Sequence, residues 1–226
     1  MFTLILLLIK DILKMCLYRR KNLLKTLATI FVSMFSLSSI PQPALAQVVV
    51  KDIGIKLGIG DTIPEALWKF PLQTVNHPSG RKTISLNEYR KSDLLILDFW
   101  ATWCGSCLNS LRKLKEIDLP KSVSILPVTA QSEKDIESSK AMSYWFKDYR
   151  PFSVTEDSIL TGYFGVQSVP DIIWIKDNKV MAITSARYLD FENILKAQVD
   201  DWSTVISKPD RISGKQSNIQ GKGGAF

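Results

Sequence analysis

The feature that most constrains this chain is a pair of cysteines placed between a strand-like run and a helix-like run. Residues 93–100, DLLILDFW, are almost continuously apolar, which is typical of a central strand buried on both faces. Residues 106–117 follow with an apolar side chain at every third position, which predicts one buried stripe along a helix. Cys104 and Cys107 therefore lie at the expected first turn of that helix.

The spacing of Cys104 and Cys107 favours redox chemistry. Two cysteines at i and i+3 in a first helical turn share one face and can form a small disulfide ring. Free backbone N–H groups at a helix N-terminus stabilise a thiolate, so we expect the pKa of the Cys104 thiol to be lowered. Cys104 would then attack a disulfide, and Cys107 would resolve the mixed disulfide. Gly105 and Ser106 permit the tight turn and add no bulk above the sulfurs.

Other roles for the cysteine pair have less support in the sequence. A zinc site normally needs four ligands, and one cysteine pair with the single histidine, His77, cannot supply them. Haem attachment would require a histidine where Leu108 stands. An inert structural disulfide is an alternative, but so short a loop adds little stability. We therefore expect no metal and no other cofactor, and we expect His77 to lie in a solvated turn.

The rest of the chain alternates strand-like and helix-like segments. The expected elements are a β-hairpin at 70–86, strands at 123–129, 152–155, 172–176 and 179–184, and helices at 133–147, 158–164 and 190–206. Together with the buried strand and its helix, this order predicts an α/β fold. Its mixed central sheet would be flanked by helices on both faces.

The N-terminus has the three parts of a secretory signal. Cations at residues 19–25 precede an apolar core at residues 26–40, and Ala44-Leu45-Ala46 matches the small-x-small pattern that signal peptidase cleaves. The apolar core is shorter than the roughly 20 residues that span a membrane. We expect a signal peptide over 1–46, with Met15 as a candidate start, and an uncleaved membrane anchor as the alternative. Export would place the cysteine pair in an oxidising compartment.

Most of the formal net charge of +7 lies at the two ends of the chain. Residues 1–46 carry six cations and one acid, and residues 208–226 carry four cations and one acid. The intervening residues are about neutral, so the charge indicates no nucleic-acid partner. We expect a lead-in segment at 47–69, one domain at 70–207 and a disordered basic tail at 208–226.

Residues 98–107, DFWATWCGSC, resemble the active-site stretch of the thioredoxin superfamily. The lead-in, the hairpin and the FWATWC wording are similar to its TlpA-type branch, the exported thiol–disulfide reductases of the bacterial envelope. The resemblance covers about residues 58–206. It implies a thioredoxin fold with an N-terminal β-hairpin extension and a reductase of protein disulfides in the periplasm or cell envelope. Its partners would be protein disulfide substrates and an upstream thiol electron donor, with membrane contact only if the N-terminal segment is uncleaved.

The resemblance also implies roles for residues outside the cysteine pair. Pro170 in Ser168-Val169-Pro170 matches the family's cis-proline, which faces the disulfide, and Val169 would contact bound substrate. The alternative is a proline that begins a strand. Trp103 is expected to form a surface platform for substrate beside Gly105 and Ser106.

Asp98 stands where thioredoxin carries a buried acid. An acid inside an apolar strand is costly unless it is paired or neutral. By the resemblance, Asp98 would have a raised pKa and accept the proton of the resolving thiol, Cys107. The alternative is a solvated acid at the end of the sheet.

The direction of the redox reaction stays open in the sequence. Many reductases of the family carry proline where this chain has Ser106, and proline there favours a reducing potential. A disulfide oxidase or isomerase is therefore one alternative, and the potential of the Cys104–Cys107 couple distinguishes it from a reductase. A non-catalytic binding module with the thioredoxin fold is another, although an intact cysteine pair beside Asp98 and Pro170 argues against it.

Overall fold

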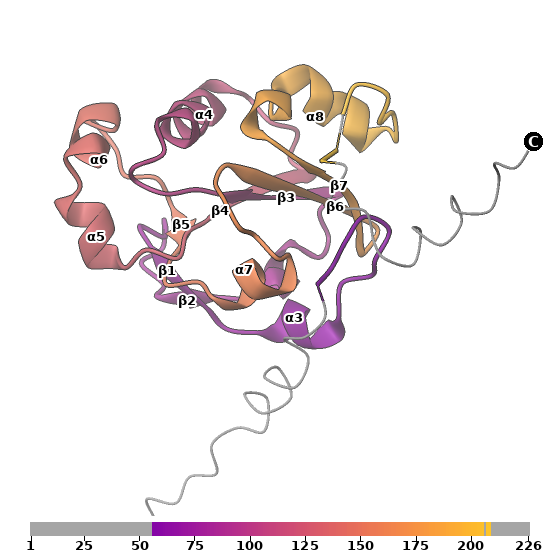
Figure 1. Ribbon diagram of the computed structural model, residues 1–226, viewed down its shortest axis with the longest axis horizontal. Helices are drawn as coiled ribbons and strands as arrows, with labels where there is room; N and C mark the ends of the chain where they lie inside the picture. The colour runs from indigo at the N-terminus through magenta and orange to yellow at the C-terminus, as the bar shows by residue number, and fades with distance from the viewer. Residues whose placement is uncertain (1–55, 206, 209–226) are drawn as a thin grey trace, which may run out of the picture. The chain divides into compact units, whose positions relative to one another are not determined.

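The computed structural model describes residues 56–205, 207 and 208, so the expected signal and all of the expected tail except Lys208 lie outside it (Figure 1). Its strands are β1 (Leu72–Val75), β2 (Thr83–Ile84), β3 (Leu94–Phe99), β4 (Val123–Val128), β5 (Ser153–Val154), β6 (Asp171–Lys176) and β7 (Lys179–Thr184). Its α-helices are α3 (Glu65–Lys69), α4 (Gly105–Glu116), α5 (Glu133–Ser138), α6 (Lys140–Trp145), α7 (Ile159–Tyr163) and α8 (Phe191–Gln198). Two short 3₁₀ helices are η1 (Leu86–Tyr89) and η2 (Ala186–Tyr188).

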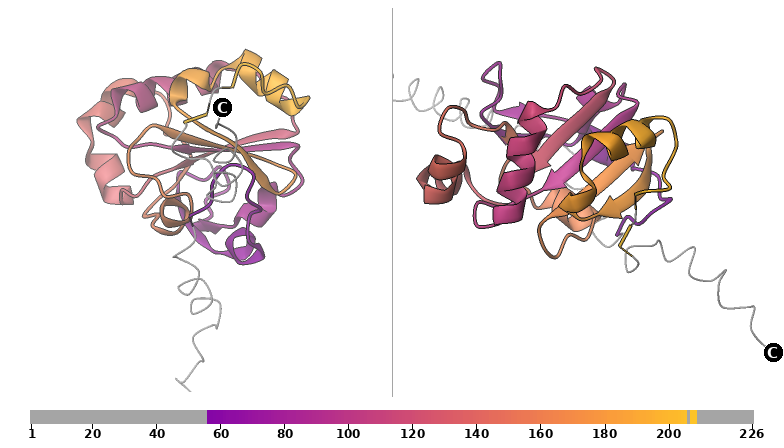
Figure 2. Two further views of the ribbon diagram at one scale, coloured as in Figure 1. Left: turned by 45° about the vertical axis from the view of Figure 1, so that its right-hand side comes forward. Right: turned by 90° about the horizontal axis from the view of Figure 1, so that it is seen from above.

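The strands form one mixed sheet in the order β2-β1-β5-β4-β3-β6-β7. Strand β3 pairs in parallel with β4, and β4 pairs in parallel with β5. The other pairs, β1 with β2 and β5, and β6 with β3 and β7, are antiparallel. Helices α4 and α8 cover one face, and α3 and α7 cover the other (Figures 1 and 2). This architecture confirms the predicted α/β thioredoxin fold.

Strand β3 is buried on both faces, as its apolar run predicted, because all six of its residues are buried. Successive side chains of a strand point to opposite faces of its sheet. Leu95, Leu97 and Phe99 accordingly belong to the core cluster that includes α3 and α7. Leu94 and Ile96 belong to the cluster that includes α8 and Leu114 of α4. Strand β3 is therefore an interior strand of the sheet, and the cysteine segment follows directly after it.

The hairpin and the lead-in segment are both built into the domain. Strand β1 pairs with β2 on one side and with β5 on the other, so the expected hairpin forms one edge of the main sheet. In the lead-in, Leu57, Ile63 and Leu67 are buried in the core. The backbone N–H groups of Gly60 and Ile63 also donate to carbonyls of the β6–β7 hairpin, at 2.7 and 2.9 Å. The described part of the lead-in is therefore core and does not merely precede the domain.

The segment predicted as one helix over 133–147 is two short helices. Its break lies at Ser139, whose backbone is extended (ψ 119°). The Ser139 hydroxyl accepts the N–H of Met142 and so caps the start of α6. A serine side chain that bonds to its own backbone competes with helix continuation, which explains the break.

The last helix is shorter than the predicted 190–206. Helix α8 ends at Gln198, and Asp200 has φ 64°, a left-handed conformation that stops a helix. Trp202 then returns to pack edge-on against Trp174 of β6. Among the described residues, no helix is both long enough and apolar enough to cross a membrane.

Candidate active site

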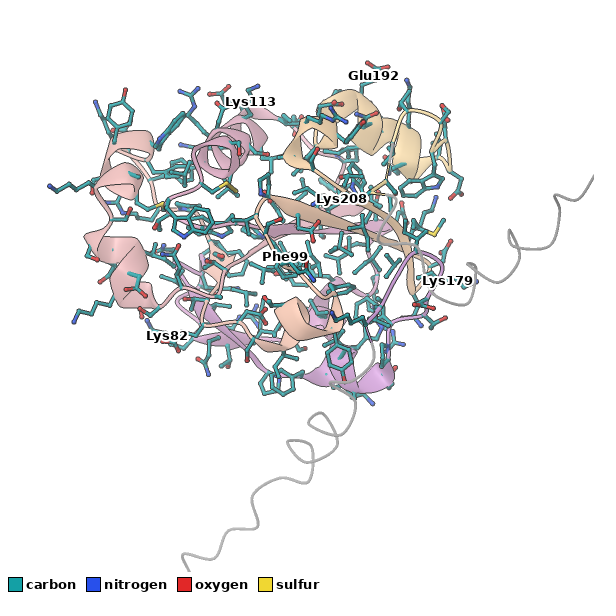
Figure 3. The ribbon with its side chains drawn as sticks, in the orientation of Figure 1. Lys82, Phe99, Lys113, Lys179, Glu192 and Lys208 are labelled. Atoms are coloured by element: carbon teal, nitrogen blue, oxygen red, sulfur yellow. A yellow bond between two sulfur atoms is a disulfide. The ribbon has the colours of Figure 1, made fainter. Side chains whose placement is uncertain are left out.

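Cys104 and Cys107 form a disulfide at the start of α4, drawn as a yellow bond in Figure 3. Their Cα atoms are 5.2 Å apart. Cys104 is the N-cap of α4, and its sulfur accepts the backbone N–H of Cys107 at 3.2 Å. The Ser106 hydroxyl lies 3.5 Å from the same sulfur. After reduction these dipoles would stabilise a negative charge on the Cys104 sulfur.

The two cysteines differ in their access to solvent. Cys104 keeps 6% of its surface exposed, whereas Cys107 has none. Next to Cys104, the side chain of Trp103 is 73% exposed, and Gly105 and Ser106 are also exposed. Cys104 is therefore the more accessible of the two cysteines, and three of the predicted contact residues, Trp103, Gly105 and Ser106, are exposed next to it.

Asp98 lies in β3, fully buried, and neither of its carboxylate oxygens has a hydrogen-bond partner. Loss of hydration on burial raises the pKa of this carboxyl from 3.8 to about 7. In the neighbouring strand β6, the residue opposite Asp98 is Ile172, which faces the α8 side of the sheet. Trp100, two residues along on the same face, packs in one cluster with both cysteines. The solvated position considered from the sequence is wrong for Asp98, because the interior of the fold encloses it.

The loop before β6 meets the same region. The Val169–Pro170 peptide bond is cis, as the family resemblance implied. Val169 packs against the cluster that contains Cys104 and Cys107. Two segments that are distant in the sequence are thus brought together at the disulfide.

A cleft of about 220 Å³ is lined by Trp103, the residue before Cys104, although neither cysteine lines it. Its lining includes Trp103 after β3, Gln131 after β4, Gln167 and Val169 before β6, and Thr161 of α7. None of the residues that line it carries a charge. Sequence reasoning did not find the cleft, because its walls come from segments that only the fold brings together.

Gln131 is a further residue that sequence reasoning missed. Its side-chain oxygen accepts the backbone N–H of Thr102 at 2.6 Å, and its amide donates to the Thr102 hydroxyl at 3.0 Å. The carbonyl of Gln131 also accepts the hydroxyl of Thr155 and the N–H of Glu156. Gln131 thereby ties the segment that carries Trp103 and Cys104 to the adjacent loop.

His77 stands apart from this site, in the turn between β1 and β2. Its Nδ1 accepts the backbone N–H of Ser79, and its ring packs edge-on against Phe152 at 5.0 Å. Within the described part of the chain, no group of three or more His, Cys, Asp and Glu side chains is arranged to hold a metal ion.

The comparisons with known proteins include thioredoxins, thiol–disulfide oxidoreductases and a peroxiredoxin Q from Xanthomonas campestris. No family model matches the chain. A thioredoxin from Chlorobaculum thiosulfatiphilum is 26% identical over 87 residues, which are 38% of this chain and 60% of that protein. The match thus spans less than two thirds of the relative.

Solved structures with a similar course of the chain include two bacterial proteins. One is the thioredoxin domain of a thiol-disulfide oxidoreductase from Bacteroides vulgatus, with 17% identity and a TM-score of 0.45, which covers 64% of this chain and 98% of that one. The other is an exposed lipoprotein thioredoxin from Streptococcus pneumoniae, with 24% identity and a TM-score of 0.41, which covers 58% of this chain and 98% of that one.

Proposed function

We propose that this chain, a member of the thioredoxin superfamily, is a thiol–disulfide oxidoreductase that reduces protein disulfides through its Cys104–Cys107 couple. The observation that carries the proposal is the placement of the disulfide at the start of α4. There the Cys104 sulfur accepts the N–H of Cys107, and the preceding residue, Trp103, lines an uncharged cleft. A disulfide with only a structural role would gain nothing from a polarised Cys104 sulfur.

In the first step, the Cys104 thiolate attacks one sulfur of the client disulfide. The client S–S bond breaks, a mixed disulfide with Cys104 forms, and the other client sulfur leaves as a thiolate that takes up a proton. The greater exposure of Cys104 supports this order of events, because a folded client cannot reach the buried sulfur of Cys107.

In the second step, Cys107 resolves the mixed disulfide. Its thiol proton passes to the Asp98 carboxylate, its sulfur attacks the Cys104 sulfur, and the second client thiolate is released. Two electrons have then passed from the dithiol to the client. A pKa of about 7 suits Asp98 to this exchange, because a general base works best with a pKa near the ambient pH.

Client binding is proposed at the surface around Cys104. Trp103, Gly105 and Ser106 lie exposed there, and Val169 and Pro170 come from the facing loop. The backbone beside Val169 would pair with an extended client segment, as the family resemblance implies. An upstream thiol donor would then reduce Cys104–Cys107 again.

We place this activity in the periplasm or cell envelope and in the TlpA-type branch. The support lies in the sequence, in the cations of residues 19–25, the apolar run that follows and Ala44-Leu45-Ala46. These residues lie outside the described structure.

The experiment that tests the proposal is a redox titration of the mature protein against glutathione, combined with an insulin-reduction assay. A reductase should have a potential near that of thioredoxin, about −270 mV, and should reduce insulin with a thiol donor. A potential near about −120 mV would indicate an oxidase instead. A chain that reduces no disulfide at all would be a binding module, and the proposal would fail.

A further inference from the structure

The end of the described chain returns to the sheet beside the candidate site. Strand β7 is an edge strand, and its Ile183 bonds to the returning segment in two ways. The carbonyl of Ile183 accepts the N–H of Lys208 at 2.8 Å, and its N–H donates to the Ser207 hydroxyl at 3.3 Å. Lys208, which the sequence placed at the start of a disordered tail, is therefore bonded to β7. Its position is labelled in Figure 3.

The ammonium group of Lys208 reaches past β7 to the first residue of β6. Its Nζ lies 2.8 Å from Oδ1 of Asp171 and 3.4 Å from the carbonyl oxygen of Pro170. Asp171 is only 1% exposed and sits opposite Phe99 in the sheet. A carboxylate that is buried so completely requires compensating charge or hydrogen bonds.

The Lys208–Asp171 ion pair lies next in the chain to a segment that lines the cleft. Asp171 follows Pro170 in the chain, and Val166, Gln167, Ser168 and Val169 all line the cleft. An anchor on Pro170 and Asp171 therefore fixes the end of the loop that faces the disulfide.

We propose that Lys208 is a positioning residue for client binding. Its ammonium group contacts Pro170 and Asp171, which directly follow the loop segment (residues 166–169) that lines the cleft. This inference rests on the proposed function, since it concerns clients of the same disulfide. Lys208 touches no reacting atom, so it should influence how well an extended client fits between the loop and Trp103. The chemistry of the sulfurs should depend on it much less.

The chain offers a matched control at the opposite end of the same strand. Lys176, the last residue of β6, lies 2.8 Å from Oδ1 of Asp200 and donates to the carbonyl of Gln198 at 2.8 Å. It thus makes the same two kinds of contact as Lys208, one to a carboxylate and one to a backbone carbonyl. It makes them to the segment that ends α8, and none of its partners lines the cleft.

The test compares Lys208→Met, Lys208→Arg and Lys176→Met in the mature chain. For each variant, kcat and KM are measured for insulin reduction with dithiothreitol as donor. The rate at which the reduced protein reacts with oxidised glutathione and the midpoint of thermal unfolding are measured as well. For Lys208→Met we expect KM for insulin to rise about tenfold, which corresponds to about 1.4 kcal/mol, with kcat and the glutathione rate nearly unchanged. Lys208→Arg keeps the cation, so its KM for insulin should stay close to that of the natural chain.

The double variant Lys208→Met/Asp171→Asn separates positioning from stability. Removing both charges avoids leaving a buried carboxylate without its ammonium group. The midpoint of thermal unfolding should therefore return toward that of the natural chain. The insulin KM should stay high, because the contact to Pro170 is still missing. A KM that recovers together with stability, or that rises equally in Lys176→Met, would overturn the inference. A natural chain that reduces neither insulin nor glutathione would instead overturn the proposed function, and this inference with it.

Discussion

Gln131 holds Thr102 by two hydrogen bonds, one to its backbone N–H at 2.6 Å and one to its hydroxyl at 3.0 Å. The two residues are 29 positions apart and belong to loops that follow neighbouring parallel strands. Thr102 stands two residues before Cys104, so this contact links the segment that carries Cys104 to the loop after β4.

Gln131→Leu should therefore weaken both the fold and the reaction. It leaves the Thr102 N–H without its acceptor, and an unsatisfied buried group costs about 1–3 kcal/mol. We expect a loss of that size in the free energy of unfolding, measured by urea denaturation, and slower attack of Cys104 on insulin. Gln73→Leu, which changes an exposed glutamine on β1, is the control and should change neither quantity. A Gln131→Leu protein with natural stability and rate would show that the contact is dispensable.

The two cysteines should behave differently when each is replaced. Cys107→Ser keeps Cys104, the more accessible of the two sulfurs, and removes the resolving thiol, so mixed disulfides between Cys104 and clients should accumulate. Cys104→Ser leaves only the buried thiol of Cys107 and should trap few or none. Non-reducing electrophoresis with mass spectrometry measures the adducts. Equal trapping by both variants would contradict the assignment of nucleophile and resolver.

Asp98→Asn should slow the second step more than the first. Asparagine keeps the shape of the side chain but accepts no proton, so resolution by Cys107 should lose its base near neutral pH. Stopped-flow measurement of a single turnover with a disulfide peptide separates the two steps. Equal slowing of both steps, or of neither, would remove Asp98 from the proposed mechanism.

The same substitution should change how stability depends on pH. The pKa of Asp98 is about 7 in the folded chain and near 3.8 in the unfolded chain, so between these values the folded state binds the extra proton. The stability of the natural chain should therefore fall as pH rises from about 4 to about 7, by up to roughly 4 kcal/mol, and then level off. The advantage of Asp98→Asn should be largest above pH 7 and fade as the pH falls below it. Denaturation across this range checks the sign, and an advantage that grows toward acid pH would contradict it.

Export should remove the N-terminal segment. Cleavage after Ala46 predicts a mature protein that begins at Gln47, which intact-mass spectrometry of the exported chain would reveal. Ala46→Phe, which destroys the small residue before the cleavage point, should leave the longer form in place. Recovery of the natural chain with its original start at Met1 or Met15 would contradict cleavage and favour the membrane anchor.

Local patterns in the sequence determined much of the fold and the centre of the candidate site. The unbroken apolar run predicted β3, and the apolar side chain at every third position predicted α4. The strands expected at 172–176 and 179–184 left Asp177 and Asn178 for the turn between β6 and β7. Asp177 and Asn178 do adopt the positive φ values of such a turn, at 48° and 64°. The cysteine pair could be assigned to redox chemistry for the same reason, because its meaning depends on neighbours along the chain.

Only the tertiary structure decided which distant groups meet. Strand order and register decide that both oxygens of Asp98 are left without a partner. They also decide that Lys208 forms an ion pair with Asp171, 37 positions away in the sequence. The cleft and the contact of Gln131 with Thr102 depend on them as well. A periodic pattern tells which face of a strand is buried, but not what covers it. The pKa of Asp98 is therefore a property of the fold, because it arises from packing that removes water from the carboxyl and supplies no replacement.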